Sequence, residues 1–432
     1  MKKSAFFLLL FISIHGFSRQ TNPDLIGYWH NWDDLNAPYI QLNQVDPRYT
    51  IIEIAFATPV FGTHASMQFT PTGTQVPDFI NDVHLLQSQG RKVLISIGGA
   101  TDPVTLSDTS DRNTFVTTLL GILDTYDFDG IDIDLEGSSL STSGGSISNP
   151  VDAPVILLID AVREIMRQYA LLNNKRMILT MAPETAFVQG GMSAFGGIWG
   201  AYLPVVEALK DSIEILQVQL YNSGSMYGID GNVYSQGTAD FIVAMTEAVI
   251  RGFPTPGGVF SGLSAEHVAV ALPACPSAAG SGYTNPAVVE SAINYLRGTG
   301  PQPGTYTLMQ TGGYPGLRGM MTWSINWDVV NTCASSNEYA DNYENIFSST
   351  TSIQQPEVSG FEMSPNPATS TLYCSGFFPE ALTREIQILN ILGEKMTEQA
   401  VIDNSVSIDV SGFPKGIYFV KTASSSRRII IH

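Results

Sequence analysis

Runs of apolar, β-branched residues alternate with amphipathic segments through most of this 432-residue chain. The runs are typical of strands, and they begin near Asp24, Thr50, Lys92, Phe128, Met177, Glu214, His267 and Arg318. Segments with helical periodicity, such as 155–169 and 240–249, lie between them. Eight strands with intervening helices predict an α/β fold in the form of a (β/α)8 TIM barrel. Periodicity alone leaves a doubly wound open sheet as the alternative.

The end of the chain has a different pattern. Residues 348–360 are rich in Ser, Thr, Gln and Pro, and no helical periodicity returns after them. We interpret this segment as a linker. Residues 361–432 contain short apolar strands separated by the turn segments Asn390–Gly393 and Gly412–Gly416. This pattern predicts a small C-terminal β-sandwich.

The first residues have the features of an export signal. Lys2 and Lys3 precede the apolar run 5–14, and small or polar residues follow near Gly16. The run is shorter than the roughly 20 residues that a membrane-spanning helix needs. We therefore predict a signal peptide over residues 1–19, a mature chain with no membrane span, and a protein that is secreted to the cell surface or beyond it.

The charge and the cysteines restrict the partners and the chemistry. The formal net charge is -19, which argues against nucleic acid or an anionic membrane as a partner and favours a neutral substrate. The spacing of Cys275, Cys333 and Cys374 does not resemble a zinc site. Both a Cys275–Cys333 disulfide and three free thiols remain open. We expect a monomer that needs no cofactor.

A row of acidic residues occupies one predicted strand, Phe128–Glu136. Side chains alternate along a strand, so Asp132, Asp134 and Glu136 share one face. Burial of adjacent like charges is relieved when one group keeps its proton, as a general acid must. Glu136 ends the strand, on the side where barrel enzymes carry their active sites. A metal site is the alternative, but no His cluster accompanies the acids, and we expect no bound metal.

This segment resembles the DxxDxDxE signature on the fourth barrel strand of glycoside hydrolase family 18. The resemblance extends over roughly residues 22–347. It rests on further segments at Gly27–Trp29, Ala55–Ala57, Ser96–Gly99, Met181–Glu184, Gln219–Asn222 and Trp323–Asp328. The last 70 residues or so resemble the C-terminal sorting domain of the type IX secretion system, through Gly416–Lys421 and the basic pair Arg427 and Arg428. A carbohydrate-binding β-sandwich is the alternative there, but this part contains no tryptophan.

The family resemblance implies a secreted chitinase, which hydrolyses β-1,4-linked N-acetylglucosamine polymers with retention and uses the substrate's own acetamido group as the nucleophile. Glu136 would protonate the glycosidic oxygen. Asp134 would stabilise the oxazolinium ion that forms, and Asp132 would share a proton with Asp134. Tyr221 would donate to the acetamido oxygen. All four are expected catalytic residues.

The resemblance also assigns the residues around these four. Trp323 would form the floor of the subsite for the distorted sugar. The other expected substrate contacts are Tyr28, Phe56, Gln219, Asn222, Met181 and Glu184. Gln219 and Asn222 stand where the family often has Met and Asp, which predicts a polar pocket. Asp129, Ser96, Gly98 and Gly99 are expected to be structural, with Asp129 bracing the acids and the glycines allowing close backbone approach. For Trp29, Trp32, Trp199 and Trp327, core packing and sugar contact both remain open.

The length of one connection bears on the mode of cleavage. About 45 residues separate the seventh predicted strand, ending near Pro273, from the eighth, starting near Arg318. This is too short for the additional α+β domain that deepens the groove in some relatives, so an open groove and cleavage within chains are expected. Two other functions remain possible: an endo-β-N-acetylglucosaminidase acting on N-glycan cores, which uses the same acids, and a chitin-binding lectin, which the presence of Glu136 disfavours.

Overall fold

The structure is a computed structural model that describes residues 23–330, 332–348, 362–375, 385–391, 393–401, 405–422 and 426–432. The chain divides into two compact units, one ending at Ser349 and the other beginning at Thr350. The predicted signal peptide lies outside the described residues, and so does the predicted linker except for Ser348. In the part of the chain that is described, no helix has the length and apolar character that crossing a membrane requires.

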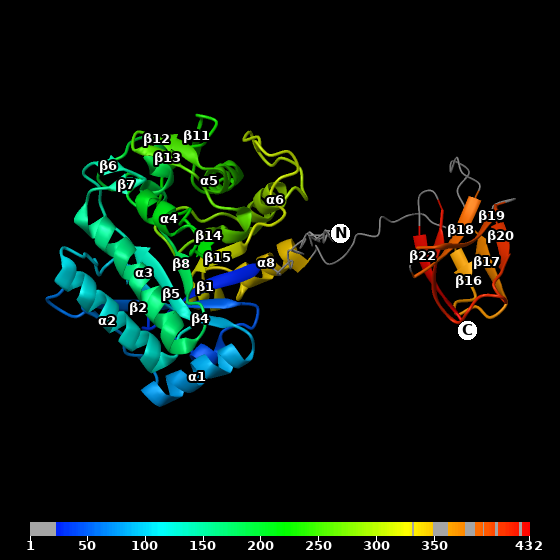
Figure 1. The fold of residues 1–432 in the computed structure, drawn as a ribbon, viewed down its shortest axis with the longest axis horizontal. Helices are drawn as coiled ribbons and strands as arrows, with labels where there is room; N and C mark the ends of the chain where they lie inside the picture. The colour runs from blue at the N-terminus through cyan, green and yellow to red at the C-terminus, as the bar shows by residue number, and fades with distance from the viewer. Residues whose placement is uncertain are drawn as a thin grey trace, which may run out of the picture. The chain divides into compact units, whose positions relative to one another are not determined.

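The first unit is a barrel of eight parallel strands surrounded by helices (Figure 1). The strands are β1 (Asp24–His30), β2 (Ile51–Pro59), β4 (Lys92–Gly99), β5 (Gly130–Leu135), β8 (Ile178–Met181), β9 (Ile215–Leu216), β14 (Ala269–Pro273) and β15 (Gly319–Trp323). They pair in the order β14-β15-β1-β2-β4-β5-β8-β9. Parallel bridges from Leu216 to Val268 and from Gln219 to Ala271 join the two ends of this order. The predicted TIM barrel is confirmed, because the end strands of a doubly wound sheet would not meet.

The helices are α1 (Val76–Ser88), α2 (Thr109–Tyr126), α3 (Ala153–Asn173), α4 (Leu203–Leu209), α5 (Ala239–Arg251), α6 (Pro286–Leu296), α7 (Ile325–Val329) and α8 (Glu338–Ser348). Capping residues set several of their first turns. Asp108 accepts a hydrogen bond from the Asp111 amide before α2, and Thr238 accepts one from the Phe241 amide before α5. Short elements fill the connections: β3 (Met67–Gln68), β6 (Gly145–Ser146), β7 (Asn149–Pro150), β10 (Ser225–Tyr227), β11 (Val233–Ser235), β12 (Phe253–Thr255), β13 (Gly258–Phe260), and the 3-10 helices η1 (Leu42–Gln44), η2 (Thr185–Phe187), η3 (Gln189–Met192) and η4 (Ala265–His267).

The strands separate two packing regions. Outward residues such as Trp29 and Ile131 join the large apolar core under the helices, while Tyr28 and Ala55 belong to a smaller cluster inside the barrel. Close strand packing depends on Gly130 at the start of β5, since a Cβ there would lie 1.9 Å from the Ile178 carbonyl oxygen. The period-2 pattern of each strand therefore decides which side chains face the barrel axis.

The second unit is built from two antiparallel sheets. One contains β16 (Glu362–Ser364), β17 (Thr371–Ser375) and β20 (Ser405–Asp409), and the other contains β18 (Glu385–Asn390), β19 (Lys395–Ala400), β21 (Gly416–Lys421) and β22 (Ser426–Ile431). Leu372 and Ile408 of the first sheet share one buried cluster with Ile388, Val420 and Ile429 of the second. The predicted small β-sandwich agrees with this arrangement.

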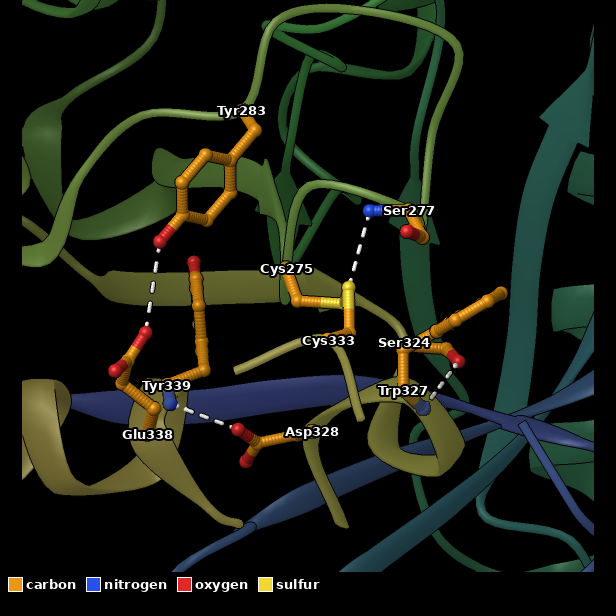
Figure 2. The surroundings of a disulfide bond; sticks show 9 residues. All are labelled: Cys275, Ser277, Tyr283, Ser324, Trp327, Asp328, Cys333, Glu338 and Tyr339. Carbon is orange, nitrogen blue, oxygen red and sulfur yellow. Dashed lines mark hydrogen bonds between the residues drawn. A yellow bond between two sulfur atoms is a disulfide. The ribbon is translucent and has the colours of Figure 1, made fainter. Parts of the chain in front are cut away.

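One disulfide forms in the first unit. Cys275, two residues after β14, is bonded to Cys333, which follows α7, and the Ser277 amide donates a hydrogen bond to the Cys333 sulfur at 3.1 Å (Figure 2). Cys374 is a buried free thiol in the second unit. Of the two possibilities that spacing left open, the structure selects the disulfide.

Candidate active site

A cavity of about 510 Å³ opens at the carboxyl ends of the barrel strands. It is lined by Asn31, Trp32, Ala55, Phe56, Thr58, Ala100, Thr101, Asp102, Glu136, Gln219, Tyr221, Asn222, Ala278, Ala279 and Trp323. These residues come from β2, β15 and the segments that follow β1, β4, β5, β9 and β14. The cavity is thus assembled from parts of the chain almost 300 residues apart (Trp323 is 292 positions from Asn31).

The acidic residues of β5 run from the barrel interior to this cavity. Asp132 is fully buried, and its Oδ2 accepts hydrogen bonds from the Tyr28 hydroxyl at 2.7 Å and the Ser96 hydroxyl at 2.6 Å. Asp134 is also buried, while Glu136 is partly exposed and lines the cavity. The row therefore has a closed inner end and an end that a ligand can reach. We call Asp132, Asp134 and Glu136 the acid row.

Gln219 connects the two outer acids. Its Nε2 lies 2.9 Å from Asp134 Oδ1, 3.0 Å from Glu136 Oε1 and 2.9 Å from the Ala182 carbonyl oxygen. The amide has two hydrogens for these three acceptors, so they share it. One side chain after β9 thus contacts both the buried Asp134 and Glu136, which lines the cavity.

Burial raises the pKa values of the two inner acids, Asp132 and Asp134. Burial raises the pKa of Asp132. Burial, followed by the charges of Glu136 and Asp132, raises the pKa of Asp134 well above its usual range. Asp132 and Asp134 together therefore keep a proton at a pH where isolated carboxyls would be ionised, and this proton belongs to the pair. Burial and the charges of Asp134 and Glu136 likewise raise the pKa of Tyr221, which keeps its phenol a hydrogen-bond donor.

Aromatic rings form the apolar side of the cavity. The rings of Phe56 and Trp323 are 5.9 Å apart and nearly parallel, at 13°, and Trp32 lies 6.3 Å from Trp323. Such faces suit the C–H face of a pyranose ring. Trp32 thus lines the cavity. Trp29 is fully buried and donates to the Ile40 carbonyl, and Trp327 packs against the main core. Trp199 is exposed and lies outside the cavity lining.

Three expected substrate contacts lie elsewhere. Tyr28 is 1% exposed, behind Phe56 and Trp323, and its hydroxyl is engaged by Asp132. Met181 is fully buried in the core under the helices, because its neighbour Thr180 takes the inward position on β8. Glu184 is partly buried outside the cavity lining, where burial and the charge of Glu136 raise its pKa.

Asn222 and the two glycines that end β4 lie at or next to the cavity. Asn222 lines the cavity, and its Oδ1 accepts a hydrogen bond from the Ser281 amide at 3.1 Å. Gly98 has a φ of +107°, and a Cβ there would lie 2.5 Å from the Asp134 carbonyl oxygen, so this position needs glycine. Next to it, a Cβ on Gly99 would lie 2.8 Å from the Phe56 ring.

Asp129 has a different place from the one expected. It precedes β5 at the end opposite the cavity, where it accepts from the Val93 amide at 3.2 Å and pairs with Lys175 at 3.5 Å and with Lys92 at 3.9 Å. It therefore ties β5 to β4 and does not brace the acid row, because it lies three positions of extended chain before Asp132.

Sequence reasoning missed a fourth inward carboxyl, Glu53 on β2. It is fully buried, and Gln217 Nε2 donates to its two oxygens at 2.7 and 2.8 Å. Thr180 Oγ1 lies 2.9 Å from Glu53 Oε1 and 2.7 Å from Asp132 Oδ1. The available signal was an acid inside the apolar run 51–57, at a position with the same parity as Ala55.

Known proteins resemble this chain over the barrel and over its C-terminal part. Residues 24–256 match the model of the glycosyl hydrolases family 18. The chain is 46% identical over 310 residues to Chitinase Chi52 of Paenibacillus xylanexedens, covering 71% of this chain and 58% of that protein. It is 45% identical over 321 residues to Chitinase D of Niallia circulans, covering 73% of this chain and 60% of that protein. The chain thus spans about three fifths of the length of these curated relatives.

A solved structure, that of a family GH18 chitinase from Chromobacterium violaceum, has a TM-score of 0.67 and 35% identity, covering 76% of this chain and 83% of that one. Residues 362–432 match the model of the secretion system C-terminal sorting domain. This match confirms the predicted sorting domain and with it the secreted or cell-surface location. From the family match over the barrel, and from the acid row that ends in its cavity, it follows that the chain belongs to the glycosyl hydrolases family 18.

Proposed function

We propose that this protein is a chitinase that hydrolyses β-1,4 linkages within N-acetylglucosamine chains, with Glu136 as the general acid. The observation that carries the proposal is the acid row, which ends at Glu136 in a cavity that also contains Tyr221 and the ring of Trp323. The similarity to relatives named as chitinases supports the same substrate class.

In the proposed mechanism, a sugar ring packs on Trp323 and its glycosidic oxygen lies beside Glu136. Glu136 donates a proton to that oxygen while the acetamido carbonyl oxygen attacks the anomeric carbon, which releases the leaving sugar and forms an oxazolinium ion. Asp134 stabilises the positive charge, and the Tyr221 phenol donates to the acetamido oxygen. Water then attacks the anomeric carbon with Glu136 as the base. Two inversions at one carbon give net retention.

Cleavage within chains requires an open groove. Residues 274–318, all of which are described, contain α6 and no strand, so no additional α+β domain stands between β14 and β15. This supports the endo mode. The proposed organisation is a signal peptide over 1–19, the catalytic barrel over 22–347, a linker over 348–360 and the sorting domain over 361–432, with export through the type IX machinery.

The test is a time course on a defined N-acetylglucosamine hexamer, with product length and anomeric configuration followed together. We expect β-anomers first and products of several lengths from the earliest time. Glu136→Gln should lower kcat by about 10³-fold or more while oligosaccharide binding persists. The exposed Glu266→Gln serves as the control and should behave as the wild type.

Retained turnover in Glu136→Gln, or inverted products, would reject the catalytic assignment. Disaccharide as the sole first product would reject the endo mode. Cleavage of a high-mannose glycoprotein with no attack on colloidal chitin would instead identify an endo-β-N-acetylglucosaminidase.

A further inference from the structure

The proposed mechanism does not use Glu53, although this carboxyl is connected to Asp132 of the acid row through Thr180. Glu53 is on β2, it is fully buried, and its partners are an amide from Gln217 and the hydroxyl of Thr180. Burial and the charge of Asp132 raise the pKa of Glu53, and the hydrogen bonds from Gln217 and Thr180 lower it. None of these three residues carries a positive charge. Among the described residues that contact Glu53 there is no cation to balance a charge on it.

The hydroxyl of Thr180 joins Glu53 to Asp132. Its Oγ1 is 2.9 Å from Glu53 Oε1 and 2.7 Å from Asp132 Oδ1, and both distances are those of hydrogen bonds. A hydroxyl carries a single hydrogen, so it can donate to one of these carboxyls only. The other contact needs a proton from the carboxyl itself. One of Glu53 and Asp132 is therefore a neutral acid.

The surrounding donors decide which of the two holds the proton. Asp132 receives the hydroxyls of Tyr28 and Ser96 on its second oxygen, in addition to Thr180. Glu53 has a single amide nitrogen shared between its two oxygens. Hydrogen bonds to the charged form stabilise it, so the negative charge belongs on Asp132 and the proton on Glu53. The rise in the pKa of Glu53, caused first by burial and then by the charge of Asp132, agrees with this order.

We propose that Glu53 is a positioning residue of the acid row, which stores a proton and delivers it through Thr180 to Asp132 when Asp134 passes its own proton to Glu136 and becomes negatively charged beside the substrate. In this step the Glu53 O–H bond breaks as Thr180 Oγ1 accepts the proton, and the original Thr180 proton bonds to Asp132 Oδ1. Asp132 becomes neutral, Glu53 becomes a carboxylate held by Gln217 and Thr180, and Thr180 is unchanged. Asp134 then has no charged neighbour at Asp132, and the return of the proton resets the row.

The proposal rests on the proposed function and is tested through the pH dependence of kcat on a soluble oligosaccharide. Glu53→Gln keeps the size and shape of the side chain but has no acidic proton to deliver. The acid row of this variant should therefore lose its last proton at a lower pH than that of the wild type. We expect the alkaline limb of the kcat profile to move down by about one pH unit, with the acid limb unchanged. Thr180→Val should cause the same shift and Thr180→Ser should restore the limb. The double variant should shift no further than either single variant.

Thr322→Val is the matched control, since it removes a buried barrel hydroxyl that donates to the Leu272 carbonyl and, within the described part of the chain, to no carboxyl. It should leave the alkaline limb in place. An infrared difference spectrum of wild type against Glu53→Gln at neutral pH supplies a readout that does not depend on turnover, and it should contain the C=O stretch of a neutral carboxylic acid.

An unshifted alkaline limb in Glu53→Gln, or a difference spectrum with a carboxylate band in place of the acid band, would overturn the role of Glu53. Either result counts against the role of Glu53 only if the wild type is active. An inactive wild type would reject the proposed function, and the infrared result would still decide where the proton lies.

Discussion

His30 is the residue whose burial has the plainest consequence for pH. It ends β1 with 2% of its surface exposed, and its ring stacks on Trp32 at 4.3 Å and 12° and lies 5.0 Å from Trp323. Neither ring nitrogen has a hydrogen-bond partner among the described residues. Burial lowers the pKa of His30 to about 4, against a weaker opposite effect from Asp34. The His30 imidazole, which packs against Trp32 and Trp323, is therefore neutral in the folded protein at neutral pH.

This burial predicts a loss of stability in acid. In the unfolded chain His30 titrates near pH 6.5, so below that pH the unfolded state binds a proton that the folded state excludes. The stability contributed by neutral His30 is present in full above about pH 6.5 and disappears as the pH falls towards 4, with a total of about 3 kcal/mol. Unfolding by urea at a series of pH values measures it.

His30→Phe keeps the stacked ring and removes the titration, so its stability should change less between pH 7 and pH 4 than that of the wild type. The exposed His64→Gln is the control and should follow the wild type. Parallel curves for His30→Phe and the wild type would contradict the assignment.

At the scale of elements, the segments after β14 and β15 are tied together at the cavity. Cys275 after β14 is bonded to Cys333 after α7 (Figure 2). Ser324 caps α7 by accepting from the Trp327 amide at 3.4 Å, and Asp328 accepts from the Tyr339 amide at 2.7 Å. Ala278 and Ala279, which follow Cys275, line the cavity. The disulfide therefore fixes the position of the cavity-lining segment that contains Ala278 and Ala279, and it also stabilises the barrel.

Removal of the disulfide should lower the stability of the barrel and weaken substrate binding in the cavity. The Cys275→Ser/Cys333→Ser variant opens a connection of 58 residues and should lose about 2–4 kcal/mol of unfolding free energy. KM should rise more than kcat falls, because the loop, and not the acid row, is released. Thermal unfolding with and without a reductant measures the effect. Reductant should lower the Tm of the wild type to that of the double variant and leave the variant itself unchanged; a wild type insensitive to reduction would contradict the expectation.

At the scale of the molecule, each of the two compact units has its own buried core. A unit with its own core can fold independently. A chain ending at Ser348 should therefore keep the Tm of the barrel transition and the kcat on a soluble oligosaccharide. Calorimetry of the full and shortened chains tests this, with Glu136→Gln in the shortened chain as the inactive control. A lower barrel Tm in the shortened chain would mean that the units stabilise each other.

The amino-acid sequence was sufficient to predict the eight barrel strands and the acid row of β5. All eight predicted strand starts lie within two residues of the observed ones. The reason is that the pattern that identifies a strand depends only on the residues of that strand. The same local rule placed Asp132, Asp134 and Glu136 on one face.

Which side chains meet across the barrel could be seen only once the folded chain was described. Glu53 and Asp132 are 79 positions apart and are joined by Thr180 from a third strand. Gln219 joins Asp134 to Glu136, and Tyr28 lies behind the cavity wall with its hydroxyl on Asp132. These contacts depend on the register of strands distant in sequence and on closure of the ring, and neither is encoded within one segment.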